Sequence, residues 1–453
     1  MSFKNFSFFT ILTVFFCFFI ACGGDETVSE SSSPNPLIRA NKSSIVFGNT
    51  MVSKSSESVS IFVESKNVNS ESTITSSDAF EISFNNIEFF NTLSLGVNQS
   101  KNLYVRFKPT EIKSYSGVLK IENSLAPNVN VTLSGDGIQL RYNYLTFSNK
   151  RLAFGSGYSQ SSSQNFDLHN DLSNVESVKM YVKLRCPSGG CNAWDVYANI
   201  YVKDPQSSKW LEIGRYITPY GVDNSKLDRG FEIDVTDFKS LLVGNVELKA
   251  FIEVWGSDGW NLSVDFDYLD GKPDYKNYAI TPIIQYNSNS LNGVVYGEDQ
   301  SDFDLDKFIS VGENIEKAHL RTIITGWGHA TPNDPDGRGC AEWCFRTHSI
   351  KIDDVEKFNH YLGPIGCASN PVNPQSGNWS PDRAGWCPGM SVPLRIDNLD
   401  SNISNTNFNF EYTFAPWVNN LKYDGQNPHA YYAISSFIVL KSNSEINAAI
   451  VSD

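Results

Sequence analysis

The chain has 453 residues, of which 40% are hydrophobic and 13% aromatic, so it holds enough apolar surface for about two to four packed domains. Its formal net charge of −14 argues against nucleic-acid binding, because an acidic protein repels phosphate backbones. Short alternating segments rich in Phe, Tyr, Trp, Thr, Ser and Asn recur between turn residues. This pattern predicts an all-β protein with many loops.

The N-terminal segment has the features of an export signal. Lys4 opens a short positive region, and residues 6–21 are almost wholly apolar. Because about twenty apolar residues are needed to span a bilayer, this run is short for a transmembrane helix and typical of a signal peptide. We therefore place a signal peptide at residues 1–21.

A cysteine preceded by a small residue follows this run, as Ala21-Cys22-Gly23. The pattern resembles a bacterial lipoprotein signal, in which the chain is cut before Cys22 and that residue is lipidated. The alternative is an ordinary secretory signal with an incidental cysteine. Residues 22–37, rich in Ser, Glu and Pro, are expected to form a flexible tether. The protein is thus expected to be exported, as an outer-membrane or cell-surface lipoprotein or, alternatively, as a periplasmic or secreted protein.

Residues 38–138 are predicted to form a first domain. Apolar and polar residues alternate in several short segments, and turn-rich pieces separate them. About one hundred residues of such strands suggest an immunoglobulin-like sandwich. The stretches Val105–Pro109 and Leu133–Gly137 resemble hydin-type immunoglobulin-like domains, which are usually spacers or interaction modules.

Six cysteines remain after the N-terminal segment, and an even number in an exported chain indicates disulfides. Pairing between neighbours is the simplest expectation, although other connectivities are formally possible. Zinc is not expected, because the sequence has no repeated Cys-x-x-Cys and no paired histidine motif. The expected pairs are Cys186 with Cys191, Cys340 with Cys344, and Cys367 with Cys387.

Residues 139–272 form a second β-rich block that contains two notable carboxylates. The alternation over 196–202 predicts a strand with one apolar face, and Asp195 stands at its entry. A later strand carries Glu253 between two aromatic residues, one of them Trp255. Such a carboxylate is unusual on a solvated face, although a glutamate that reaches water from the edge of the core is an alternative.

Residues 277–453 are expected to form the last domain, and their most distinctive stretch is Arg338–His348. Within it, Cys340 and Cys344 bracket Glu342. A bridge between the cysteines would fix the backbone that carries Glu342. A held carboxylate beside an aromatic residue suggests a sugar-binding or acid–base site. The alternative is a structural disulfide loop with a surface glutamate.

Four longer stretches carry a more specific pattern: Glu212–Tyr220, Glu232–Leu242, Gly339–His348 and Pro381–Met390. Over roughly the last two-thirds of the chain, these stretches are similar to the bacterial peptide-N-glycosidase F family. The resemblance implies two adjacent eight-stranded antiparallel jelly-roll sandwiches with the active cleft between them. It also implies the three local disulfides.

The resemblance further implies the site residues. The family's essential aspartate follows a Cys-x-x-Trp run and corresponds to Asp195, and its two supporting glutamates correspond to Glu253 and Glu342. The matching residues expected to bind substrate are Trp255, Trp327, His329, Arg383 and Trp386.

The implied reaction is hydrolysis of the amide that joins an asparagine side chain to the first N-acetylglucosamine, which leaves aspartate and a glycosylamine. Asp195 is expected to activate the attacking group, Glu342 to share its hydrogen-bond network, and Glu253 to give lesser support. Adjacent carboxylates resist joint ionisation, so one of them is expected to hold a proton near neutrality. No metal or organic cofactor is implied. The expected partners are N-glycosylated proteins or glycopeptides, and the chain is expected to be a monomer that meets a membrane only through its lipid.

Two positions depart from the family's best-known member. Val196 replaces an arginine directly after the aspartate, and Ala193 replaces an acidic residue two positions before it. Because a guanidinium offers donors to glycan or peptide, the glycan specificity stays open.

Two other function classes are compatible with paired sandwiches. A non-catalytic N-glycan-binding lipoprotein would use the same cleft, but it has no need of three acids. A copper monooxygenase requires clustered His and Met ligands, and in this chain the histidines are isolated and only four Met are present.

Overall fold

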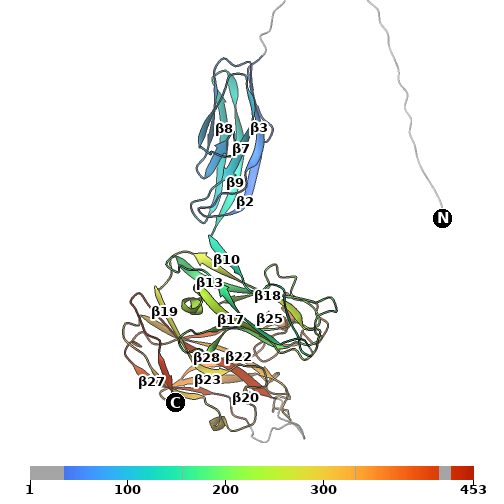
Figure 1. The fold of residues 1–453 in the computed structure, drawn as a ribbon, viewed down its shortest axis with the longest axis vertical. Coiled ribbons are helices and arrows are strands. Elements are labelled where there is room, and N and C mark those ends of the chain that lie inside the picture. The colour runs from blue at the N-terminus through green and yellow to red at the C-terminus, as the bar shows by residue number, and fades with distance from the viewer. Residues whose placement is uncertain (1–34, 156, 332, 418–429) are drawn as a thin grey trace, which may run out of the picture. The chain divides into compact units, whose positions relative to one another are not determined.

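The computed structural model describes residues 35–155, 157–331, 333–417 and 430–453, which fall into two compact units. The predicted signal peptide, Cys22 and most of the tether lie outside the described residues. β-strands dominate both units, so the predicted all-β class is confirmed (Figure 1). Within the described ranges, no helix has the length and apolarity needed to cross a membrane.

The N-terminal unit is the expected immunoglobulin-like sandwich of two antiparallel sheets. Alternate residues of its strands point into one core, where the rings of Phe80 and Phe107 stack with centroids 5.1 Å apart. One sheet has the order β1 (Leu37–Ala40), β3 (Val59–Lys66), β7 (Ser100–Phe107), β5 (Phe80–Ser83), and the other β2 (Ser44–Met51), β9 (Ala126–Ile138), β8 (Ser114–Asn123), β4 (Ser72–Ser76), β6 (Thr92–Leu95).

The second unit contains two sandwiches, of which the first encloses a core centred on Met180, Ile200 and Phe266. Its two sheets have five strands each, so short edge strands are present in addition to the eight strands expected. A short 3₁₀-helix, η1 (Thr236–Leu241), follows β16. One sheet has the order β10 (Arg141–Leu145), β18 (Trp260–Asp270), β13 (Val175–Arg185), β16 (Phe231–Asp234), with β11 (Lys150–Leu152) beside β18, and the other β12 (Ser161–Asp167), β17 (Asn245–Ile252), β14 (Tyr197–Lys203), β15 (Trp210–Ile217), β25 (Met390–Ser391).

The second sandwich is built in the same way around Leu320, Ile350 and Phe410. Its short 3₁₀ turns are η2 (Gln300–Asp302) and η3 (Cys367–Ser369). One sheet has the order β19 (Asn277–Tyr286), β28 (Tyr431–Ser442), β22 (Lys317–Trp327), β26 (Arg395–Asn398), with β20 (Val294–Val295) beside β28, and the other β24 (Val355–Leu362), β23 (Arg346–Ile352), β27 (Asn407–Thr413), β21 (Asp306–Ser310), β29 (Ile450–Ser452).

A buried ion pair joins the two sandwiches of this unit. Glu212 and Arg215 lie on β15, and both side chains are fully buried. Arg215 donates to Glu212 through Nε (2.9 Å) and Nη2 (2.8 Å). Its Nη1 donates to Thr325 Oγ1 (2.9 Å) on β22 and to the Ala433 carbonyl (2.7 Å) on β28. The pair therefore binds a sheet of the first sandwich to a sheet of the second.

Strand β14 of the first sandwich also packs against the second sandwich. Its apolar face lies in the core, as its alternating sequence predicts. The opposite face is also buried, because Asn199 and Tyr197 reach across to the second sandwich and donate to the Asn287 carbonyl at 3.0 and 2.7 Å. A polar face that resembles a solvated surface in the sequence is therefore part of an internal interface.

Candidate active site

Asp195 stands two residues before the start of β14 and is the first of the predicted acids. Thr218 holds the backbone on both sides of it: the Val196 amide donates to Thr218 Oγ1 (2.8 Å), and that hydroxyl donates to the Trp194 carbonyl (3.3 Å). The Cys186–Cys191 disulfide closes the loop that precedes it. Only 9% of the Asp195 side chain is exposed, so its carboxylate is fixed and largely shielded from water.

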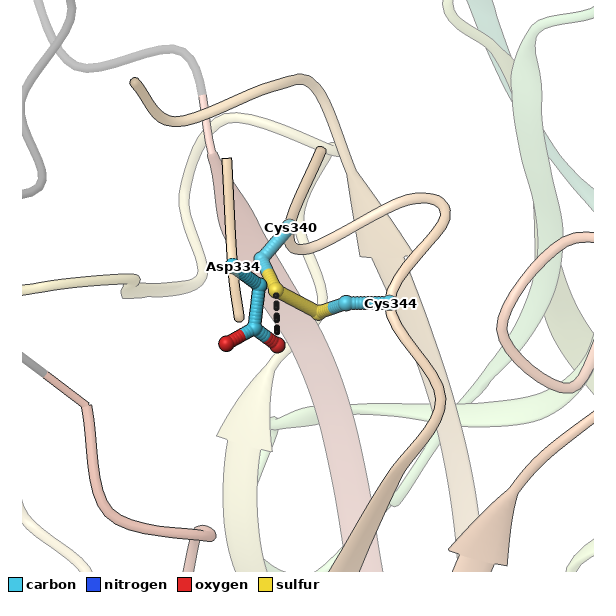
Figure 2. A group of neighbouring side chains, drawn as sticks. All are labelled: Asp334, Cys340 and Cys344. Atoms are coloured by element: carbon cyan, nitrogen blue, oxygen red, sulfur yellow. Dashed lines mark hydrogen bonds between the residues drawn. A yellow bond between two sulfur atoms is a disulfide. The ribbon is translucent and has the colours of Figure 1, made fainter. Parts of the chain in front are cut away.

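Glu342 is held by the short loop that Cys340 and Cys344 close with a disulfide, as predicted. The sulfur of Cys340 lies 3.3 Å from a carboxylate oxygen of Asp334 (Figure 2). This trio brings possible metal ligands together, but a bridged sulfur offers no thiolate to an ion. Arg346 pairs with the Asp334 carboxylate and balances its charge. The loop is therefore a structural support for Glu342.

Two backbone hydrogen bonds hold Glu342 within the second sandwich. Its amide donates to the Gly328 carbonyl (3.2 Å) just after β22, and its carbonyl accepts from the Ala384 amide (2.8 Å). Ala384 belongs to the loop that the Cys367–Cys387 disulfide closes, the third predicted pair. The Glu342 side chain is 15% exposed, so it is a half-enclosed acid and not a free surface glutamate.

Gly326 on β22 allows this loop to approach. A Cβ at Gly326 would lie 2.1 Å from the Ala341 carbonyl oxygen, a backbone atom that cannot move without displacing Glu342. We expect Gly326→Ala to destabilise the unit by about 1–3 kcal/mol, as overpacking does. Because all nine tryptophans follow residue 137, urea unfolding monitored by tryptophan fluorescence reports on this unit alone.

The matched control is Gly312→Ala, because a Cβ at Gly312 meets no atom within 4 Å. This variant should unfold at the same urea concentration as the parent chain. Equal unfolding midpoints for the two variants would contradict the tight approach at Gly326.

Arg383 lies between the two acids and is fully buried. Its Nη2 is 3.6 Å from Asp195 Oδ2, and its Nε is 3.6 Å from Glu342 Oε1. The guanidinium is fixed from behind, where Nη1 donates to the Pro381 carbonyl (2.7 Å) and Nη2 to the Asn378 carbonyl (2.6 Å). One immobile cation thus faces carboxylates from both sandwiches.

Two polar atoms of this group lack a hydrogen bond. Asp195 Oδ2 and Arg383 Nε are both buried without a partner, and separations of 3.6 Å are too long for good hydrogen bonds. Buried polar atoms are rarely left unpaired, because each one costs about 1–3 kcal/mol. An unpaired acceptor and an unpaired donor on one cation–carboxylate group are suited to a polar ligand.

The environment of Asp195 changes its acidity. Burial, and then the nearby charge of Glu342, raise the pKa of Asp195 to about 7, although Tyr220 and Arg383 act in the opposite direction. Asp195 therefore takes up and releases a proton near neutral pH. This supports the expectation that one carboxyl of the group holds a proton there.

The raised pKa of Asp195 has a consequence for stability. The folded state binds this proton more tightly than the unfolded chain, so the ionised carboxyl destabilises the fold increasingly between pH 3.8 and pH 7. We expect Asp195→Asn to stabilise the unit by up to about 4 kcal/mol at pH 8 and by little at pH 4. Urea unfolding monitored by tryptophan fluorescence measures this difference.

Asp228→Asn is the matched control, since it removes the same charge from an exposed position of the same sandwich. It should give no stabilisation that grows with pH. A pH-independent effect of Asp195→Asn would contradict the burial argument.

His329 stands beside Glu342. Its Nε2 lies 3.5 Å from Glu342 Oε2 and accepts a hydrogen bond from the Trp343 indole (2.9 Å). Hydrogen bonding of the protonated ring to Glu342 raises the pKa of His329, and the bond from Trp343 belongs to the neutral ring, because one nitrogen cannot donate and accept at once. Trp343 also lies against Arg383, whose guanidinium carbon is 4.4 Å from its ring centroid. His329 and Trp343 therefore form one wall of the same group.

The third acid, Glu253, is placed differently. It is 4% exposed and accepts a hydrogen bond from the Ser290 amide (2.9 Å), so it does not reach water from the core edge. Burial raises its pKa. Its own amide donates to the Tyr197 carbonyl (2.9 Å), two residues beyond Asp195. Glu253 thus links the Asp195 strand to a loop of the second sandwich.

The predicted tryptophans occupy three different environments. Trp255 is 62% exposed, and its ring meets Phe154 edge-on at 5.1 Å. Trp327 is partly buried and lies against Trp386, with ring centroids 4.5 Å apart and the rings tilted by 31°. Trp386 is fully buried and donates to the Gly326 carbonyl (3.0 Å). The guanidinium carbon of Arg383 lies 5.6 Å from the Trp386 ring centroid, and the role of Trp386 in binding substrate stays a prediction.

Two residues near the acids were not in the predicted set. Trp343 could have been identified, since it is adjacent to Glu342 in the sequence. Tyr220 contacts Arg383 from another part of the chain, and no local pattern marks it. The substituted position Val196 packs against the core of the first sandwich, and Ala193 is exposed.

Known proteins resemble this chain over much of its length. A family model described as peptide-N-glycosidase F, C terminal, matches residues 296–439. Peptide-N(4)-(N-acetyl-beta-D-glucosaminyl)asparagine amidase F from Elizabethkingia miricola is 53% identical over 312 residues, which are 69% of this chain and 87% of that protein.

Solved structures add to this similarity. PNGase F, a glycosylasparaginase from Flavobacterium meningosepticum, is 52% identical with a TM-score of 0.66, over 69% of this chain and all of that one. PNGF-II is 14% identical with a TM-score of 0.55, over 85% of this chain and 89% of that one, and this likeness concerns the fold alone.

Proposed function

Because the chain belongs to the peptide-N-glycosidase F family, and so is an amide hydrolase that removes N-linked glycans from glycoproteins, we propose that it does so at the Asp195–Arg383–Glu342 group. The observation that carries this placement is the pair of buried, unpaired atoms, Asp195 Oδ2 and Arg383 Nε. They offer one acceptor and one donor, which suits a site for water and an amide.

In this proposal, Asp195 in its ionised form takes a proton from water as the water oxygen attacks the amide carbon of asparagine. The C–N bond then breaks, and the same proton passes to the departing nitrogen. The peptide retains an aspartate, and the glycan leaves as a glycosylamine. Arg383 stabilises negative charge with its free Nε–H, while Glu342 and His329 bind the sugar or position the water.

We propose that the site binds a sugar against exposed aromatic side chains at its edge. Trp255 is exposed and offers a flat apolar face, while Trp386 lies against Arg383 and Trp327 lies against Trp386. Glu253 supports the same edge through its bond to Ser290. Val196 lacks the guanidinium found in the family's best-known member, so the range of accepted glycan cores differs from that of an arginine-bearing relative.

The test is a mass measurement on a defined glycopeptide incubated with the full chain. We expect loss of the whole glycan with conversion of Asn to Asp. A peptide that keeps one N-acetylglucosamine would indicate a glycosidase and overturn the amidase mechanism. An intact glycopeptide that still binds would indicate the non-catalytic alternative.

We also propose how the enzyme is located. Its three disulfides are typical of an exported protein. The Ala21-Cys22 pattern supports a lipid on Cys22, which would attach the chain to the outer membrane or cell surface, with the immunoglobulin-like sandwich acting as a spacer. Radiolabelled palmitate incorporated into the parent chain, and absent from Cys22→Ser, would support this attachment.

A further inference from the structure

Tyr220 comes from the first sandwich, and its hydroxyl group contacts the Arg383 guanidinium of the second. The residue follows β15 in the first sandwich and is 7% exposed. Its hydroxyl accepts a hydrogen bond from Arg383 Nη2 at 3.0 Å, and that nitrogen also lies 3.6 Å from Asp195 Oδ2, so one guanidinium nitrogen faces both the hydroxyl and the carboxylate. A guanidinium only donates and a phenol has one proton, so the phenol proton is not used on Arg383 and is available to the Asp195 carboxylate, whose pKa Tyr220 lowers.

The loop of the second sandwich holds Tyr220 in place. The Tyr220 amide donates to Gln375 Oε1 (2.9 Å), and its carbonyl accepts from the Ser376 amide (3.0 Å). Its ring lies so close to Gly377 that a Cβ there would come within 2.2 Å of it. These contacts leave the phenol little freedom, so the place of its hydroxyl is set by the backbone of both sandwiches.

We propose that Tyr220 is a positioning residue, whose hydroxyl donates to Asp195 while accepting from Arg383 and so fixes the base relative to the cation. This inference deepens the proposed function and rests on it. Asp195 comes from the first sandwich and Arg383 from the second. A single phenol between them keeps both at their separation of 3.6 Å, and leaves Asp195 Oδ2 and Arg383 Nε free for substrate.

Removing the hydroxyl should make Asp195 harder to ionise. The groups that face Asp195 are Glu342, which disfavours its charge, and Tyr220 and Arg383, which favour it. Glu342 is in turn faced by His329. In Tyr220→Phe, one of the two favourable contacts disappears. Because catalysis requires the ionised base, the pH at which kcat/KM is half-maximal should move upward.

The experiment compares Tyr220→Phe with the parent chain between pH 5 and pH 9.5 on one glycopeptide. We expect an additional loss of about tenfold in kcat/KM at pH 6 relative to pH 9, which corresponds to a shift of one pKa unit. Tyr216→Phe is the matched control, because the Tyr216 hydroxyl is buried in the first sandwich without a hydrogen-bond partner. An equal loss at every pH, or an unchanged profile, would overturn the proposal.

A second readout does not need turnover. The stabilisation caused by Asp195→Asn at pH 8 is measured in the parent chain and in Tyr220→Phe by urea unfolding. It should be larger in Tyr220→Phe, where the ionised Asp195 has lost a donor. Equal increments would overturn the contact. Absence of deglycosylation by the parent chain at every pH would overturn the proposed function instead, and the two failures are therefore distinguishable.

Discussion

Asp195→Asn is expected to lower the rate of glycan release by about 10²–10⁴-fold, which is the range that a positioned general base contributes. An amide at this position keeps the size of the side chain but cannot accept a proton from water. The carboxyl is 9% exposed and its neighbours hold it in place, so no bulk water can substitute for it in the same geometry. The assay is the appearance of the Asn-to-Asp mass change over time, with Asp228→Asn as the active control.

A loss of activity alone does not separate a catalytic role from a damaged fold. Asp195→Asn can distinguish these two causes by its effect on stability, because the same substitution is expected to stabilise the unit at pH 8. A variant that is inactive and more resistant to urea has lost the base and kept the fold. Full activity of Asp195→Asn would exclude Asp195 as the base, and low activity with lowered stability would indicate misfolding.

The sequence predicts the fold class well, because alternation within strands is a local pattern. The alternation over 196–202 identifies a strand, and the bracket of two cysteines marks Glu342 as a held carboxylate. Family resemblance relates Asp195 to Glu342, which are 147 positions apart, and the structure brings both within 3.6 Å of Arg383. Alternation alone does not provide that pairing.

The sequence does not predict that a sheet at the interface between the two sandwiches is buried on both of its faces. Asn199 and Arg215 alternate with apolar residues, as in a strand with one solvated face, yet they are at most 1% exposed. The period of two separates the faces of a strand but does not tell what covers each face. Tyr220 was missed for a related reason, since its partners Asp195 and Arg383 come from different parts of the chain.

Arg215→Met is expected to destabilise the second unit by about 3–5 kcal/mol, the usual cost of breaking a buried ion pair from one side. The parent side chain satisfies its donors on Glu212, Thr325 and Ala433. In the variant, the Glu212 carboxylate keeps contacts to Asn199 (3.1 Å) and Ser435 but loses its counter-charge at a fully buried position. The measurement is urea unfolding followed by tryptophan fluorescence.

The double variant Arg215→Met, Glu212→Gln separates lost charge balance from lost packing. Because the glutamine leaves no uncompensated charge, it should recover a large part of the stability lost in the single variant. No recovery would mean that the contacts of Arg215 to β22 and β28 outweigh the ion pair. Asp195 and Arg383 belong to different sandwiches, so Arg215→Met or Glu212→Gln alone should also loosen the site. Glycan release by Arg215→Met should therefore decline at lower urea concentrations than glycan release by the parent chain.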